Sequence, residues 1–173
     1  REVVREYAER YGNVRLIDNP KRHATAAFNI GIKAATGEYV VIISAHSVYL
    51  PDYFRRSIDG LLHTDAANVG GAARLIPGSG SVVARAIAAT LGTRFGSGSS
   101  YAKNPPSEPR WVDTVFGGSF RRSLFDEIGL FDEQLKRSQD IELNGRIRAA
   151  GGRILLDPLI VSDYQVRPTL GSY

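Results

Sequence analysis

Two spacings of apolar residues alternate along the first half of the chain, one typical of helices and the other of buried strands. Apolar side chains recur at helical intervals over residues 1–11 and 24–35, which predicts a helix in each segment. Short continuous apolar runs over 14–17 and 38–44 predict strands. The run at 38–44 is apolar on both faces, as expected of a central parallel strand covered by helices.

The second half continues this alternation less regularly. We predict further helices over 51–62, 81–95, 121–128 and 138–150, strands over 68–73, 111–115, 153–156 and 159–163, and a long Gly- and Pro-containing loop over 96–109. The apolar residues of two helices should face inward: Tyr53, Phe54, Ile58, Leu61 and Leu62 in the first, and Val82, Val83, Ile87 and Leu91 in the second. Helices and strands in alternation predict an α/β domain with a parallel sheet.

Ligands in such sheets bind beyond the carboxyl ends of the strands. The segment after Ile43 and the loop before Ser138 are therefore the two places where we expect a functional site. The first contains Ser44-Ala45-His46, and His46 could offer a neutral imidazole to a divalent metal ion. The alternative is a loop histidine that is hydrogen-bonded to the backbone.

The second place contains a pair of acidic residues, Asp140 and Glu142, at the start of a predicted helix. Ser138 is suited to cap that helix, which would put Asp140 in the first turn, where the helix dipole favours a carboxylate. A carboxylate there could accept a proton from a substrate hydroxyl. Acidic residues are also common at helix starts without any function. Arg146 and Arg148 could pair with them at helical spacing or touch a phosphate, and a solvated face is the simpler reading for Arg148.

Two other polar residues have a functional and an ordinary reading. Lys21 belongs to the basic loop 20–23 beside a predicted helix start, which suits a diphosphate or is merely solvated. Asp113 precedes a Gly-rich segment and could contact an acceptor or simply end a strand.

Composition narrows the class of protein. The 173 residues are 43% hydrophobic and 23% charged, which is typical of a globular domain with a sizeable core. The net charge of +4 favours anionic partners such as nucleotide phosphates or an acidic membrane surface. The lack of cysteine excludes disulfide scaffolds, zinc fingers and thiol chemistry. Because the chain has no methionine and starts at Arg1 inside a helical pattern, we expect it to be part of a longer protein.

Two stretches of the chain resemble family 2 glycosyltransferases. Residues 24–52 are similar to the family's first signature, an Asn-x-Gly helix, an Ala-x-Gly-Glu-Tyr turn, an apolar strand and a DxD motif, through Asn29, Gly31, Ala35, Gly37, Glu38 and Tyr39. Ser44 and His46 occupy the DxD positions, and the histidine is similar to that of succinoglycan-biosynthesis-type transferases. Residues 116–152 resemble the family's Gly-rich segment, its IGxFDE element and the acidic motif that opens a helix.

The resemblance implies an α/β fold of the GT-A type, a Rossmann-like nucleotide-diphospho-sugar transferase fold, truncated at its N-terminus. Residues 1–173 would then be part of a catalytic domain, with a nucleotide-binding part at 1–75 and an acceptor-side part at 76–173. It makes Asp140 the catalytic base and His46 a ligand of Mg²⁺ or Mn²⁺. The substrate contacts that it implies are Lys21, Asn29, Ser44, Asp113, Gly117, Gly118 and Glu142.

The resulting hypothesis is an inverting glycosyltransferase of the hexosyltransferase type. It would move a sugar from a nucleotide-sugar donor to a hydroxyl of a glycan or lipid-linked acceptor in polysaccharide, including exopolysaccharide, biosynthesis. We expect it in the cytoplasm, at the inner face of the membrane, with any membrane association through regions outside this chain. The alternative is a catalytically impaired binding module, because Ser44 replaces the expected aspartate of the metal site.

Two other classes of protein fit the sequence less well. A nucleic-acid-binding protein is disfavoured because aromatic residues are not interleaved with Lys and Arg clusters. A nucleotidyltransferase is disfavoured because the sequence has no Gly-rich phosphate loop.

Overall fold

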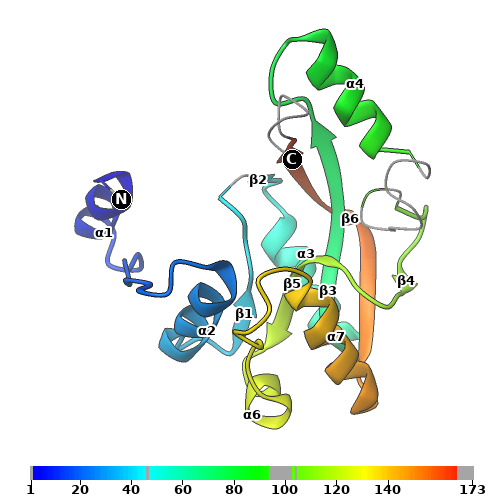
Figure 1. Ribbon diagram of the computed structural model, residues 1–173. Helices are drawn as coiled ribbons and strands as arrows, with labels where there is room; N and C mark the ends of the chain where they lie inside the picture. Colours follow the sequence, from blue (N-terminus) through cyan, green and yellow to red (C-terminus); the bar gives the residue numbers. More distant parts are fainter. Residues whose placement is uncertain (1, 46, 94–102, 104, 167–173) are drawn as a thin grey trace.

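The computed structural model describes residues 2–45, 47–93, 103 and 105–166. One curved sheet runs through them, with helices on both of its faces (Figure 1). In chain order the elements are α1 (Glu2–Arg10), α2 (Ala24–Ala34), β1 (Tyr39–Val41), β2 (Ser47–Tyr49), α3 (Tyr53–His63), β3 (Ala66–Ile76), α4 (Val82–Leu91), β4 (Arg110–Trp111), β5 (Phe116–Arg121), α6 (Leu124–Ile128), α7 (Gln139–Ala149) and β6 (Arg153–Gln165).

The sheet is mixed rather than parallel, which corrects the prediction from the sequence. Its strand order is β1-β5-β3-β6-β2, with β4 paired to β6 beside this path. Only β3 and β6 pair in parallel within the described residues, and the other pairs are antiparallel. The predicted central strand at 38–44 is β1, which is shorter than expected and lies at one edge of the described sheet. It pairs with β5, which we had predicted as a Gly-rich segment without a strand, leading into a helix at Arg121.

The misassignment of β5 has a physical reason. Two consecutive glycines, Gly117 and Gly118, lower the strand propensity of this segment, so that its local sequence does not indicate a strand. Pairing with β1 on one side and β3 on the other makes it one. Tertiary pairing therefore overrides propensity here.

The two late strands predicted from the sequence are one long strand, β6, which contains Pro158. Proline cannot donate a ladder hydrogen bond. The register between β3 and β6 shifts at this place, from Gly70 opposite Leu156 to Ala72 opposite Val161, so that Pro158 lies in the irregular stretch. Gly71 is needed there because a Cβ on it would lie 1.7 Å from the Ile160 carbonyl oxygen.

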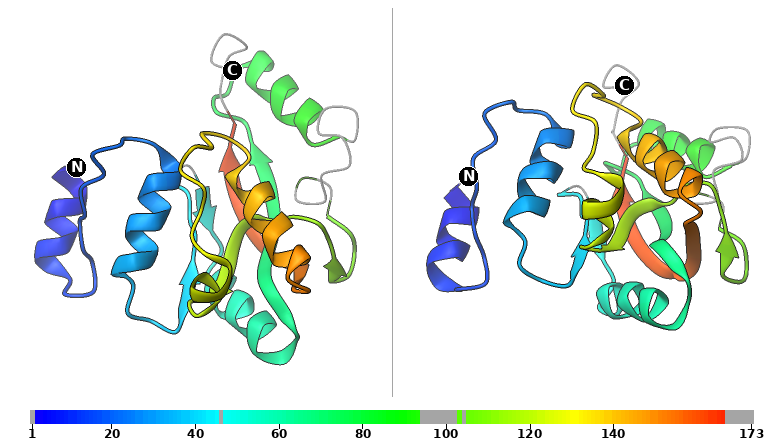
Figure 2. Two further views of the ribbon diagram at one scale, coloured as in Figure 1. Left: turned by 60° about the horizontal axis from the view of Figure 1, so that its bottom comes forward. Right: turned by 90° about the horizontal axis from the view of Figure 1, so that it is seen from below.

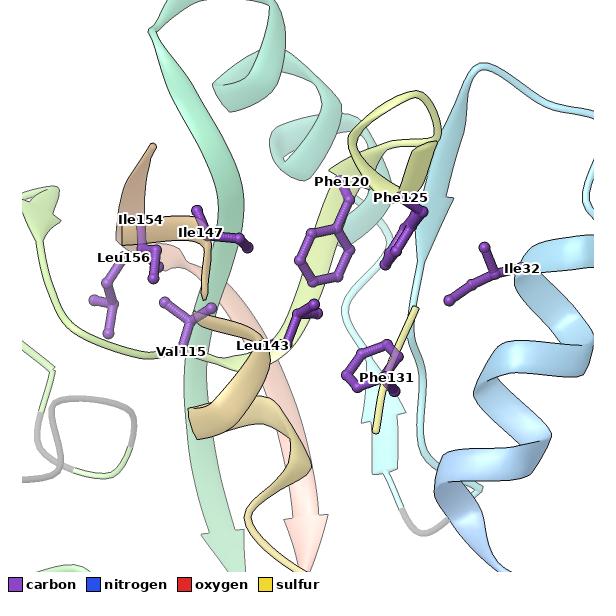
Figure 3. Close-up of a cluster of buried hydrophobic side chains, with 9 residues drawn as sticks. All are labelled: Ile32, Val115, Phe120, Phe125, Phe131, Leu143, Ile147, Ile154 and Leu156. Atoms are coloured by element: carbon purple, nitrogen blue, oxygen red, sulfur yellow. The ribbon is translucent and has the colours of Figure 1, made fainter. Parts of the chain in front are cut away.

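Successive residues of β6 enter cores on opposite faces of the sheet, as the pleat requires. Leu155 joins a cluster with Tyr53 and Leu61 of α3. Its neighbours belong to a larger cluster that α2, α6 and α7 cover, drawn in Figure 3: Ile32, Val115, Phe120, Phe125, Phe131, Leu143, Ile147, Ile154 and Leu156. The right-hand view of Figure 2 shows α3 and α7 on opposite sides of the sheet.

Several predicted inward positions are wrong. Phe54 and Leu62 on α3 are 46% and 54% exposed, and Val82 and Val83 on α4 are 72% and 51% exposed. Both helices bury a narrower stripe than their apolar content suggests. The buried residues are Tyr53, Ser57 and Leu61 in α3, and Ala84, Ile87 and Ala88 in α4. Pattern alone cannot tell which apolar residues a helix leaves outside.

The first segment of the chain lies apart from the sheet. No residue of α1, all of which is described, is buried, and both views of Figure 2 show α1 on the side of α2 that faces away from the sheet. Residues 14–17 form no strand, and Leu16 and Ile17 are 40% and 45% exposed. The predicted strand there is therefore wrong. Among the described helices, none has the length and apolar character that crossing a membrane requires.

Candidate functional site

A cavity of about 430 Å³ opens between α2, the carboxyl end of β1, β5 and the first turn of α7. This size is in the usual range for small-molecule sites. Its walls are mainly apolar, formed by side chains that also belong to or border the larger core: Phe28, Val115, Phe120, Phe131 and Leu143. Its polar lining comes from Ser44, Asn68, Gln139, Asp140 and Asn144, and from the backbone of Gly117 and Gly118.

The carboxyl end of β1 reaches the cavity through a turn. The amide of Ile42, directly after β1, donates to the Gly118 carbonyl of β5 at 3.0 Å. The chain then turns, so that the Ser44 amide donates to the Tyr49 hydroxyl at 2.6 Å and the Ser47 amide to the Ser44 carbonyl at 3.3 Å. Ser44 therefore lines the cavity, as the sequence predicted for a strand-end residue. His46 lies outside the described residues.

Two aromatic residues, Tyr49 and Tyr53, connect this turn to α3. The rings of Tyr49 and Tyr53 meet edge to face with centroids 4.7 Å apart. The Tyr53 hydroxyl donates to the Gly117 carbonyl at 3.4 Å, which joins α3 to the Gly-rich segment. Burial, with a smaller contribution from neighbouring Tyr49, raises the pKa of Tyr53 far above its ordinary value. Tyr53 therefore stays protonated and acts as a structural donor.

The two glycines of β5 allow a close approach of backbone to the cavity. Gly117 has φ of +60°, a left-handed conformation, and a Cβ on it would lie 3.1 Å from the Tyr53 hydroxyl. A Cβ on Gly118 would lie 2.3 Å from Phe120 Cζ and 2.8 Å from Asn68 Oδ1. Any side chain here would displace a wall of the cavity, which explains why both positions are glycine.

Asp140 lies in the first turn of α7 and lines the cavity with an exposed side chain. Ser138 is the N-cap residue, as predicted, and Asp140 lies in the first turn, but Ser138 has φ of +59° and its side chain makes no capping bond. The neighbouring Gln139 also lines the cavity, and its Oε1 is buried without a hydrogen-bond partner among the described residues.

The segment that leads into α7, residues 129–138, is fastened to α2. Asn29 is buried, donates to the Phe131 carbonyl at 2.9 Å and to Glu133 Oε1 at 3.0 Å, and accepts from the Phe131 amide at 3.0 Å. Lys21 Nζ lies 2.5 Å from Glu133 Oε2, and Thr25 donates to the Leu135 carbonyl at 2.7 Å. Hydrogen bonds from Lys21 and Asn29 lower the pKa of Glu133. Lys21 and Asn29 are thus outside the cavity lining and hold this segment in place.

Two further predicted contacts also lie outside the cavity lining. Glu142 forms a bidentate ion pair with Arg146, at 2.6 and 2.9 Å, and Arg146 donates to the Leu130 carbonyl at 2.8 Å and to that of Ile128. This pair fixes the other end of the same segment. Asp113 is 82% exposed and pairs with Arg148 at 2.5 Å, on the rim of a separate shallow hollow.

Asn68, Gln139 and Asn144 were missed in the sequence. Asn68 and Asn144 are only 1% and 2% exposed, although they lie in a strand and a helix whose other buried residues are mostly apolar. For Asn68, an asparagine inside an apolar run was the available signal, because a buried amide requires hydrogen-bond partners. Asn144 lies among mixed polar and apolar residues, and its local sequence gave no such signal. Gln139 directly precedes the predicted base, and nothing in its spacing distinguished it.

The described residues do not by themselves form a metal site. No group of three or more His, Cys, Asp or Glu side chains within the described ranges could hold a metal ion. Asp140 is the one carboxylate among the residues that line the cavity, and Ser44 offers only a hydroxyl, a weaker ligand for a hard divalent cation.

Comparison with known proteins gives consistent matches. A family model described as "Glycosyl transferase family 2" matches residues 1–129. The succinoglycan biosynthesis protein ExoA of Rhizobium meliloti (strain 1021) is 30% identical over 156 residues, which cover 89% of this chain and 46% of that protein. A Methanococcus voltae enzyme named dolichyl N-acetyl-alpha-D-glucosaminyl phosphate 3-beta-D-2,3-diacetamido-2,3-dideoxy-beta-D-glucuronosyltransferase is 29% identical over 182 residues, 99% of this chain and 55% of that enzyme.

Solved structures share the fold. GalNAc-T7, crystallised with UDP, GalNAc and Mn²⁺, superposes with a TM-score of 0.71 at 16% identity, over 96% of this chain and 35% of that one. The mannosyltransferase PcManGT of Pyrobaculum calidifontis, in complex with GDP-Man and Mn²⁺, gives a TM-score of 0.66 at 20% identity, over 96% and 44%. The GT-A fold predicted from the sequence is thereby confirmed. The chain spans about half the length of the curated relatives that it matches.

Proposed function

Since the chain belongs to glycosyl transferase family 2, we propose that the full-length protein is an inverting glycosyltransferase that uses the cavity at the end of β1. It moves a sugar from a nucleotide-sugar donor to a hydroxyl of a glycan or lipid-linked acceptor. The observation that carries this proposal is the placement of Asp140, a carboxylate on the wall of a cavity that also contains Ser44 and the Gly117–Gly118 backbone. Residues from separate segments of the chain that resemble the family's signatures converge there.

In the proposed reaction Asp140 acts as the general base. Its carboxylate accepts the proton of the acceptor hydroxyl while the hydroxyl oxygen forms a bond to the anomeric carbon of the donor sugar. The bond from that carbon to the diphosphate breaks, and the nucleoside diphosphate leaves with the electron pair. Attack from the face opposite the leaving group inverts the anomeric configuration. The exposed side chain of Asp140 is compatible with this role, because the acceptor must reach it from solvent.

Other predicted site residues divide into direct and indirect roles in this proposal. The direct contacts with the donor come from cavity-lining residues, Ser44, Gly117 and Gly118. The two glycines contact it through their backbone, which a side chain at either position would obstruct. Asn29 and Glu142 act indirectly, because Asn29 bonds the 129–138 segment and Glu142 holds Arg146, which bonds Leu130 of the same segment. Lys21 does the same through Glu133. Asp113 meets the acceptor only if its ion pair with Arg148 opens.

We further propose that donor binding depends on a divalent cation, Mg²⁺ or Mn²⁺. The support is that both structural neighbours were solved with Mn²⁺. Since the described residues supply one carboxylate and one hydroxyl at the cavity, a complete site would require His46 and oxygens of the donor diphosphate.

The proposed acceptor side follows from the names of the relatives. One of them is a succinoglycan biosynthesis protein, and another acts on a dolichyl-linked sugar phosphate. We therefore place the full-length protein in polysaccharide or exopolysaccharide biosynthesis, with a lipid-linked acceptor presented at the cytoplasmic face of a membrane. Contact with that membrane would use regions outside this chain.

Turnover of sugar nucleotides tests the main proposal. The full-length protein is incubated with UDP-glucose, UDP-galactose, UDP-N-acetylglucosamine or GDP-mannose and a membrane lipid extract, and release of UDP or GDP is measured. Asp140→Asn should lower release by about 100-fold or more and leave nucleotide affinity nearly unchanged, because a general base contributes about 10²–10⁴ to the rate. Asp59→Asn, an exposed carboxylate on α3 outside the cavity lining, is the matched control and should behave as wild type. Equal activity of Asp140→Asn and wild type would exclude the assigned base.

One observation favours a second candidate function. Ser44 lines the cavity where the family has a carboxylate, so the protein could be a nucleotide- or glycan-binding module without transfer activity. Calorimetry with UDP and GDP, in Mn²⁺ and in chelator, separates the two candidates. Binding that requires Mn²⁺ and weakens in His46→Ala supports the transferase. Binding without turnover, together with turnover gained in Ser44→Asp, supports the binding module.

A further inference from the structure

A line of hydrogen bonds between buried polar groups runs along the wall of the cavity and joins three elements. The Ser119 amide of β5 donates to Asn68 Oδ1 at 3.1 Å. Asn68 Nδ2 of β3 donates to Asn144 Oδ1 of α7 at 2.8 Å, and Asn144 Nδ2 donates to Thr114 Oγ1 at 2.9 Å. Asn68 and Asn144 are 1% and 2% exposed, so water does not compete for these bonds.

The direction of the line is fixed by its first member. A backbone amide can only donate, so that Asn68 must turn its carbonyl oxygen toward Ser119 and its NH₂ group toward Asn144. Asn144 must then accept with its oxygen and donate its own NH₂ group to Thr114. Each side chain is used as both donor and acceptor. Leucine would provide neither function and aspartate would provide no donor, which explains why both buried positions carry an amide.

The Asn68–Asn144 pair in the middle of this line connects the two parts of the proposed site. Asn144 follows Asp140 by one helical turn, so both lie on the same face of α7. On the other side of the pair, Asn68 Oδ1 bonds the amide next to Gly118 and lies 2.8 Å from the place where a Gly118 Cβ would be. The register between β3 and β5 is irregular just beyond this point, between Val69 and Gly71. The Asn68 side chain thus supplies a bond to β5 beside a break in the ladder.

We propose that Asn68 and Asn144 are positioning residues, which hold the helix that carries Asp140 at a fixed distance from the Gly117–Gly118 backbone. This inference rests on the proposed function, since it concerns how the base is aligned with the donor. The ion pair of Glu142 with Arg146 and the bonds of Asn29 fix the segment before α7, whereas the Asn68–Asn144 line ties the helix itself to the sheet. Neither asparagine takes part in proton transfer.

Removing the line should cost turnover more than binding. A shift of about 1 Å between reacting groups can lower a rate about 100-fold, while ground-state contacts of a flexible ligand adapt. We expect Asn144→Leu, which keeps the branched side chain of four heavy atoms and removes both hydrogen bonds, to lower kcat by about 10- to 100-fold with KM within about threefold of wild type. Thr114→Val should lower kcat less, because it breaks one bond only, and Thr114→Ser should restore most of that loss.

The experiment combines two readouts on the full-length protein. Hydrogen exchange followed by mass spectrometry reports protection of the amides in β5, including that of Ser119, and needs no substrate. Release of UDP or GDP from the donor that supports turnover reports kcat and KM. Ser57→Ala is the matched control, because Ser57 is also fully buried and hydrogen-bonded, to the Tyr53 carbonyl at 2.8 Å, but does not line the cavity.

Two results together support the proposal: faster exchange in β5 of Asn144→Leu, and a fall in kcat that Ser57→Ala does not show at equal loss of thermal stability. Unchanged kcat in Asn144→Leu would overturn it, as would equal falls in Asn144→Leu and Ser57→Ala. Unchanged exchange in β5 would overturn it even for a protein without turnover. A wild-type protein that releases no nucleotide from any donor, but shows the exchange effect, contradicts the proposed function and leaves the structural link intact.

Discussion

Asn29 provides the sharpest test of how the site is built. The sequence predicted it as a substrate contact, whereas the structure places it on α2, bonded to the segment that precedes Asp140 and away from the cavity lining. Asn29→Ala removes the bonds to the Phe131 amide, the Phe131 carbonyl and Glu133. Both backbone groups of Phe131 would then be buried without these partners.

The cost follows from these bonds. Each ordinary hydrogen bond contributes about 1 kcal/mol to stability, and a buried group left unsatisfied costs about 1–3 kcal/mol. The bond to Glu133 adds less, because that carboxylate is 30% exposed. We therefore expect Asn29→Ala to lower the free energy of unfolding by about 3 kcal/mol. With a urea slope of about 2 kcal/mol/M, the midpoint should fall by about 1.5 M.

Urea unfolding followed by circular dichroism measures this loss. Asn13→Ala, an exposed asparagine in the turn after α1, is the matched control and should change stability by no more than about 0.5 kcal/mol. The folded fraction of Asn29→Ala at low urea should bind UDP or GDP with wild-type affinity, because Asn29 does not line the cavity. A destabilisation below about 1 kcal/mol, or an affinity loss without destabilisation, would refute the structural role.

Further predictions concern Gly118, the carboxylate of Glu133 and the contacts of Arg146. Gly118→Ala should destabilise by about 1–3 kcal/mol, because its Cβ would lie 2.3 Å from Phe120 Cζ, whereas Gly12→Ala, with nothing within 4 Å, should not; thermal unfolding of both variants decides. The pKa of Glu133 is lowered, so its contribution to stability is present above its ordinary value of 4.5 and is lost as pH falls through the lowered value. Glu133→Gln should therefore flatten the dependence of the urea midpoint on pH between about 5 and 3, and an unchanged slope would contradict this. Arg146→Lys should lower the thermal midpoint by several degrees, because lysine cannot pair bidentately with Glu142 and also reach the Leu130 carbonyl. A midpoint equal to wild type would show that these contacts of Arg146 do not stabilise the fold.

Local sequence determined the helices and the motif positions of this protein. The helices α2 and α7 begin and end within a residue or two of their predicted bounds, because helical periodicity is set by neighbours along the chain. The match of Asp140 and of Gly117 and Gly118 to family motifs also needed only local order. These residues were predicted together as a site, and they line one cavity.

Only the tertiary structure determined how the strands pair in the sheet and which partners the polar residues around it bond. The identity of β5 as a strand, the mixed pairing and the edge position of β1 depend on partners that are distant in sequence, which local propensity does not contain. In the same way, the sequence predicted Asn29 and Glu142 as substrate contacts, whereas the structure bonds them to Phe131 and Arg146, outside the cavity lining. A hydrogen bond needs a partner at about 3 Å, and folding alone determines which groups come that close.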